Sequence, residues 1–160
     1  MRSRASAIVL RDNRILFIQQ YIRDKINDVF LDGGIKFIFP GGGIENCETP
    51  EQAVLRELRE EANVKGEVLY GPVPIETEGY YQTEYVFLLT INAGDVPMPG
   101  YDPEIPDGEE QSIKGIIWRD LVRDKADFSD IDKSYISSLV QHARENGLTS
   151  VWIEKLSGIL

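Results

Sequence analysis

The stretch that decides the fold of this 160-residue chain runs from Phe39 to Val64 and reads FPGGGIENCETPEQAVLRELREEANV. It opens with a run of glycines and closes on a segment rich in glutamate and arginine. Thr49, Pro50 and Gln52 together give a helix start signal. The threonine can cap free N–H groups, proline suits the first helical position, and the glutamine completes a capping box. We therefore predict a helix that begins directly after Thr49.

The predicted helix has one apolar face. Val54, Leu55, Leu58 and Ala62 recur at helical spacing and are expected to face the core. Asn63 marks the expected end, because asparagine tolerates the left-handed backbone conformation found at helix termini.

The same helix carries three acids on another face. Glu57, Glu60 and Glu61 cover one sector that is rotated away from the apolar residues. Like charges at these spacings repel by roughly 0.2–0.5 kcal/mol per pair, so local stability does not select them. An acid-rich helix face is usually only solvated surface. A hard cation such as Mg²⁺ or Mn²⁺ reverses the argument, because it prefers several oxygen ligands and retains substrate phosphates among them.

Residues upstream of the helix favour the hypothesis that the three glutamates bind a metal ion. Gly41, Gly42 and Gly43 lack Cβ atoms, so the backbone there can turn tightly and approach a ligand or ion closely. Glu48 and Arg56 are expected to form a charge-assisted pair, because arginine offers a planar fork to a carboxylate. Such a pair would hold the glycine loop against the helix.

At these residues the chain resembles the Nudix box, G-x5-E-x7-R-E-U-x-E-E-x-G-U, in which U is a bulky aliphatic residue. The matching positions are Gly42, Glu48, Arg56, Glu57, Leu58, Glu60, Glu61 and Val64. Asn63 stands where the family has glycine, which is a conformationally mild departure. The resemblance implies one Nudix hydrolase domain over residues 1–160, with the motif at about 42–64. It also implies an α/β fold, an α/β/α sandwich around a mixed sheet.

The resemblance further implies hydrolysis of a phosphoanhydride bond in a nucleoside diphosphate linked to another group. Mg²⁺ or Mn²⁺ would be the cofactor, and the implied metal ligands are Glu57, Glu60, Glu61 and the Gly41 carbonyl. Arg56 and Glu48 join Glu57 and Glu60 as the expected catalytic residues. The alternative is a Nudix-like domain that senses nucleotides or mediates interactions without catalysis. The complete set of box carboxylates favours the enzyme.

Two roles stay open at this point. The general base could be Glu57 or a glutamate on a later loop, where Glu109 and Glu110 are candidates; solvated loop acids are the simpler interpretation of that pair. For substrate binding we single out Gly42, Gly43, Tyr80 and Tyr81. These tyrosines, or Phe37, could stack on a nucleobase, although packing is the commoner role of such residues.

Composition narrows the class of protein. The net charge of −10 argues against binding a nucleic-acid duplex, and 42% hydrophobic content is ordinary for a globular domain. No apolar run approaches membrane-spanning length, and the N-terminus lacks a secretory signal. The single cysteine, Cys47, fits a reducing cytoplasm and is interpreted as incidental, as is the sole histidine, His142. A homodimer is left open.

The remaining elements follow from apolar alternation and turn signals. We predict a hairpin of strands at 6–10 and 15–20, joined by Asp12 and Asn13. Further strands are expected at 36–39, 66–70, 85–91, 113–118 and 151–156. A helix is expected from Ser129 or Asp130 to Asn146. Residues 23–34 and 92–112 are predicted to be loops.

Overall fold

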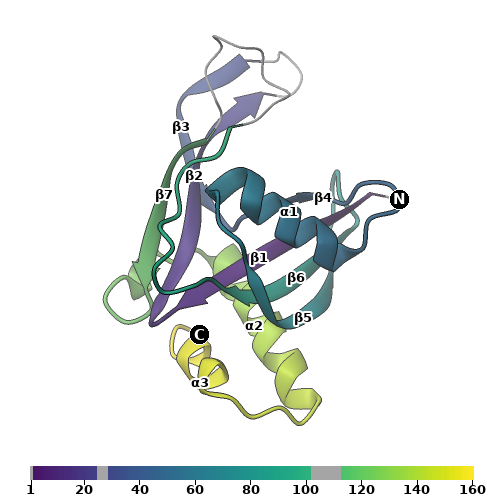
Figure 1. The fold of residues 1–160 in the computed structure, drawn as a ribbon, viewed down its shortest axis with the longest axis vertical. Helices are drawn as coiled ribbons and strands as arrows, with labels where there is room; N and C mark the ends of the chain where they lie inside the picture. Colours follow the sequence, from purple (N-terminus) through teal and green to yellow (C-terminus); the bar gives the residue numbers. More distant parts are fainter. Residues whose placement is uncertain (1, 25–28, 102–112) are drawn as a thin grey trace.

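The computed structural model describes residues 2–24, 29–101 and 113–160. Seven strands and three α-helices make up the described part (Figure 1). In chain order they are β1 (Ser3–Arg11), β2 (Arg14–Asp24), β3 (Val29–Ile38), β4 (Gly41–Gly43), α1 (Pro50–Ala62), β5 (Glu67–Glu76), β6 (Thr83–Thr90), β7 (Ile113–Asp120), α2 (Asp130–Glu145) and α3 (Val151–Ser157), with a 3₁₀ turn at Lys125–Asp127.

The sheet is mixed. Its main order is β3-β2-β1-β6-β5, with β4 added beside β1 and β7 beside β2. Only the β1–β6 pair is parallel among the strand pairs of the described residues. One edge of β1 pairs with β6, and β4 and β2 pair with successive parts of the other. β1 therefore runs through the middle of the domain (Figure 1).

Two apolar clusters fill the two faces of the sheet. One contains Val54 and Leu58 of α1 with Ala7 of β1 and Phe87 of β6. The other contains residues of α2 and α3 packed against alternate positions of the same strands. The helices thus cover opposite faces, as the predicted α/β/α sandwich requires, and Ile8 of β1 points to the face opposite Ala7.

The predicted first hairpin is confirmed, with Leu10 paired to Ile15 across the two-residue turn. The loop predicted at 23–34 is wrong at both ends, because β2 continues to Asp24 and β3 begins at Val29. The backbone pairing of this long antiparallel ladder runs through the polar and glycine-rich sequence, with Asp24 opposite Val29. The polar composition of this segment predicted a loop, but its backbone hydrogen bonds are made with the neighbouring strand.

The strand predicted at 151–156 is also wrong, since α3 occupies Val151–Ser157. Ile153 and Leu156 are both buried, at the helical spacing of three, and join Ile159 in the cluster beneath α2. A short apolar run does not distinguish a strand from a buried helix, and here contact with α2 decides. The other predicted strands and the helix capped by Ser129 are present, several of them longer than expected. Residues 92–101 form no helix or strand, and the rest of the loop predicted at 92–112 lies outside the described residues.

Candidate active site

α1 begins and ends as the sequence predicts. The Thr49 side chain accepts from the Gln52 backbone N–H at 3.1 Å, and the Thr49 N–H donates to the Gln52 side chain at 2.9 Å. Asn63 ends the helix in the left-handed conformation, with φ 54° and ψ 34°. Between β4 and this helix, Cys47 is exposed and has a φ of 63°.

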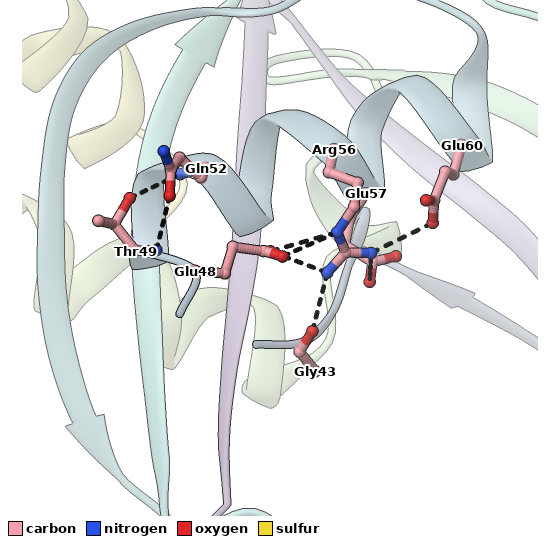
Figure 2. A network of polar contacts seen from close by, with 7 residues as sticks. All are labelled: Gly43, Glu48, Thr49, Gln52, Arg56, Glu57 and Glu60. Atoms are coloured by element: carbon pink, nitrogen blue, oxygen red, sulfur yellow. Dashed lines mark hydrogen bonds and ion pairs between the residues drawn. The ribbon is translucent and has the colours of Figure 1, made fainter. Parts of the chain in front are cut away.

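Arg56 is the centre of a polar network that joins the glycine loop to α1 (Figure 2). Its Nε donates to the two Glu48 carboxylate oxygens at 3.2 and 3.0 Å, so the predicted pair is present. Nη2 donates to the Gly43 carbonyl at 3.0 Å. Nη1 donates to Glu57 at 2.8 Å and to Glu60 at 3.2 Å. One guanidinium therefore fixes a loop carbonyl and three carboxylates in a common frame.

The glycine loop lies directly against two of the predicted metal ligands. The Gly41 N–H donates to the Glu61 carboxylate at 2.7 Å. A Cβ atom at Gly42 would lie 2.2 Å from a Glu57 carboxylate oxygen, so a larger residue there would push that side chain aside. Glycine is required here by close approach to the carboxylates of α1.

Burial raises the pKa of both carboxylates that face the loop. The pKa of Glu61 rises to about 8, because burial outweighs the hydrogen bond from Gly41. The pKa of Glu57 also rises through burial, and the neighbouring Arg56 opposes this shift. Glu60 is exposed and lies at the outer side of the cluster. Burial therefore disfavours ionisation of both carboxyl groups that face the loop.

These donors fit a hard divalent cation. Within residues 2–24, 29–101 and 113–160, no three histidine, cysteine, aspartate or glutamate side chains are arranged to hold a metal together. Arg56 and the Gly41 N–H engage the carboxylates instead. Two partly buried carboxyl groups beside a backbone loop are nevertheless oxygen donors that a divalent ion would stabilise. The assignment of Glu57, Glu60, Glu61 and Gly41 as ligands remains a prediction.

The end of α1 is covered by residues 98–100. The N–H groups of Met98 and Gly100 donate to the carbonyls of Ala62 and Glu61 at 3.0 and 2.8 Å, which satisfies two groups that a helix end leaves open. The Asn63 amide donates to the carbonyls of Met98 and Pro99 at 3.1 and 3.2 Å. The residue that departs from the Nudix box therefore attaches the following loop to the acidic helix. Glu109 and Glu110, the candidate later bases, lie outside the described residues.

A second polar network, which the sequence analysis missed, lies on the α2 side of the sheet. Glu84 of β6 is buried and accepts from the hydroxyls of Ser6 and Tyr135. Arg4 of β1 lies 3.4 Å from the same carboxylate. Burial raises the pKa of Tyr135, and its bond to Glu84 adds to the effect. A signal existed in the sequence, since Glu84 alternates with Val86 on a face that is otherwise apolar.

This network lines a cavity of about 290 Å³ next to the glycine loop. Arg4 connects the two, because it lines the cavity and also donates to the Gly41 carbonyl at 3.3 Å. The other lining residues include Lys36, Phe37, Phe39 and Ile131. The cavity therefore combines aromatic and apolar walls with a charged floor.

The predicted substrate-binding aromatic residues lie in different places. The Tyr81 hydroxyl lies beside the loop, 3.2 Å from where a Cβ at Gly43 would be. Tyr80 is 56% exposed, with the Arg2 guanidinium 4.1 Å from its ring centre. Phe37 instead lines the cavity. The structure thus places Tyr81 and Phe37 near the loop and the cavity, and Tyr80 on the surface.

Comparisons with known proteins agree with this architecture. A family model described as NUDIX domain matches residues 1–129, and the chain belongs to the Nudix family. The ADP-sugar pyrophosphatase of Mus musculus is 38% identical over 86 residues, which cover 52% of this chain and 39% of that protein. The chain thus spans less than half the length of that relative. The RNA pyrophosphohydrolase of Gluconacetobacter diazotrophicus is 35% identical over 127 residues, covering 62% of this chain and 75% of the relative.

The fold is shared with solved Nudix structures. A NUDIX-family hydrolase from Clostridium perfringens superposes with a TM-score of 0.59 at 19% identity, covering 86% of this chain and 95% of that one.

None of the described helices is long and apolar enough to cross a membrane.

Proposed function

We propose that this protein is a divalent-metal-dependent pyrophosphohydrolase. Its substrate would be a nucleoside diphosphate linked to another group, and the bond broken would be a phosphoanhydride. The observation that carries the proposal is the Arg56 network, which fixes the Gly43 carbonyl, Glu48, Glu57 and Glu60 in one frame. A solvated acidic helix would need no such attachment to a glycine loop.

The residues divide into supporting and reacting groups. Arg56 and Glu48 would hold the loop in place, because Arg56 bonds both Glu48 and the Gly43 carbonyl. Glu57 and Glu61, both against the loop, would hold the cation with the Gly41 carbonyl, and Glu60 would add an outer ligand. Bound Mg²⁺ or Mn²⁺ would neutralise phosphate charge and lower the pKa of an attacking water.

The cavity beside Arg4 is suited to a part of the substrate away from the broken bond. It adjoins the glycine loop, and Phe37 and Tyr135 offer aromatic surface for a flat ring. The relatives named for ADP-sugar and RNA pyrophosphohydrolysis indicate two substrate classes to test first, a nucleoside diphosphate sugar and a 5′-polyphosphorylated RNA. The overall charge of −10 disfavours a long duplex partner.

The test is a panel of nucleotide substrates assayed with Mg²⁺ and with Mn²⁺, with identification of both phosphorylated products. Glu61→Gln should abolish most turnover while the protein stays folded, and EDTA should abolish it in the wild type. Glu154→Gln is a matched control, because Glu154 is an exposed acid on α3. Turnover that survives exhaustive EDTA treatment would refute the metal requirement. Tight nucleotide binding without turnover on any substrate would instead support the nucleotide-sensing alternative.

A further inference from the structure

Two arginines reach carbonyl groups of the glycine loop, and they are held very differently. Arg56 donates to Gly43 and is fixed by carboxylate bonds as short as 2.8 Å. Arg4 donates to Gly41 at 3.3 Å and to Ser6 at 3.3 Å. Bonds from an N–H to an oxygen normally measure about 2.7–3.2 Å. The Arg4 guanidinium is therefore close to several acceptors without a tight bond to any of them.

The strand register explains this position. Arg4 lies on β1 opposite Gly43 of β4 on one edge and opposite Glu84 of β6 on the other. Its side chain is 25% exposed and lies 3.4 Å from the Glu84 carboxylate. It is thus placed between the cavity and the loop, with part of its side chain open to solvent.

Two cations would compete for the Gly41 carbonyl oxygen. In this structure it accepts from Arg4, and it is also the carbonyl expected to bind the divalent ion. Two positive charges beside one oxygen repel each other. A phosphate group offers arginine a stronger, bidentate partner than a single carbonyl at 3.3 Å. An anionic substrate could therefore draw the guanidinium away from this oxygen.

We propose that Arg4 binds a phosphate of the substrate, and that without substrate its contact with the Gly41 carbonyl weakens binding of the divalent ion. Metal and nucleotide would then bind cooperatively. A bound phosphate would draw Arg4 off the Gly41 carbonyl and leave that oxygen to the ion, and a bound ion would repel Arg4 toward the phosphate. The inference rests on the proposed function and adds to it the residue that couples the two ligands. Glu84, held by Ser6 and Tyr135, would keep Arg4 within reach of both partners.

The test measures binding rather than turnover. Mn²⁺ alone is titrated by electron paramagnetic resonance, and a nonhydrolysable methylene analogue of a nucleoside diphosphate is titrated by calorimetry with and without Mn²⁺. Complexation of Mn²⁺ by the nucleotide in solution is equal for all variants and cancels in the comparison. Arg4→Gln removes the charge and Arg4→Lys keeps it without the planar fork. Arg123→Gln is the matched control, since the Arg123 side chain is 71% exposed and far along the chain, after β7.

Arg4→Gln should bind Mn²⁺ alone roughly fivefold to tenfold tighter than wild type and bind the nucleotide more weakly, at the low end of the usual coupling between sites. Arg4→Lys should bind Mn²⁺ like wild type but the nucleotide more weakly. Arg4→Gln combined with Glu84→Gln avoids leaving a buried carboxylate without its cation and should show the same Mn²⁺ gain. This double variant keeps the test interpretable if the single one folds poorly.

Unchanged or weaker Mn²⁺ binding by both Gln-containing variants, relative to Arg123→Gln, would overturn the role of Arg4. The proposed function would stand in that case, provided that the wild type binds Mn²⁺ and hydrolyses a substrate. If the wild type binds Mn²⁺ neither alone nor in the presence of the nucleotide analogue, the proposed function is overturned and the Arg4 inference with it.

Discussion

Replacing Glu61 by glutamine should change how stability depends on pH. Burial raises the pKa of Glu61 from its ordinary 4.5 to about 8. Between these values the folded protein keeps a proton that the unfolded chain has lost. The free energy of unfolding contributed by this group therefore falls as the pH rises from about 4.5 to 8. Glutamine is neutral throughout, and its side-chain oxygen can still accept from the Gly41 N–H.

The size of the effect follows from the shift. Each pKa unit corresponds to about 1.4 kcal/mol. A shift from 4.5 to about 8 gives roughly 5 kcal/mol as an upper limit. Relaxation around a partly buried side chain reduces this, so we expect the variant to gain about 3 kcal/mol on wild type between pH 5 and 8. Other titrating groups are common to both proteins and largely cancel in the difference.

The assay is urea unfolding in EDTA at pH 5, 6, 7 and 8, comparing wild type, Glu61→Gln and the exposed control Glu154→Gln. A difference between Glu61→Gln and wild type that stays constant within about 0.5 kcal/mol would refute the reasoning. Saturating Mn²⁺ at pH 8 should remove most of the variant's advantage over wild type. An ion at 100 times its Kd stabilises the wild type by about 2.7 kcal/mol, while the variant has lost a ligand.

Three further outcomes are expected at the site. Glu48→Ala and Arg56→Ala should be non-additive by about 1 kcal/mol or more in a double-mutant cycle of unfolding, because they share one interaction. Additive effects would count against the pairing of Glu48 with Arg56. Gly42→Ala should cut kcat at least about tenfold with little change in Tm, since the new Cβ would displace the end of the flexible Glu57 side chain; normal kcat would contradict that geometry. Asn63→Gly should cost only about 1 kcal/mol, the loss of its amide bonds, and Asn63→Ala more, because alanine also pays for φ 54°; urea unfolding gives the order, and equal losses would show that backbone conformation is unimportant there.

The sequence predicted the motif helix and its clamp in detail because those features are local. Caps, helical spacing and an arginine eight residues after its glutamate are encoded within one short stretch. The errors arose where distant contacts decide. The helix at Val151–Ser157 depends on packing against α2, and the extension of β3 to Val29 depends on pairing with β2.

The second polar network was missed for the same reason. Arg4 and Glu84 are 80 residues apart in sequence and become neighbours only through the parallel pairing of β1 with β6. Each looks like an ordinary charged residue at the start of a strand. Glu84 is buried by α2 and accepts from Tyr135 of that helix. No local sequence pattern reveals this burial, so the need of Glu84 for partners could not be predicted.

Cys47 gives this protein an experimental convenience that its chemistry does not require. It is the only thiol in the chain, it is exposed, and it lies next to Glu48 in the connection between the glycine loop and α1. A nitroxide or fluorophore could be attached there without adding or removing a single cysteine. Such a label would report, in the unmutated protein, on the arrival of a paramagnetic ion and on any movement of the loop that accompanies it.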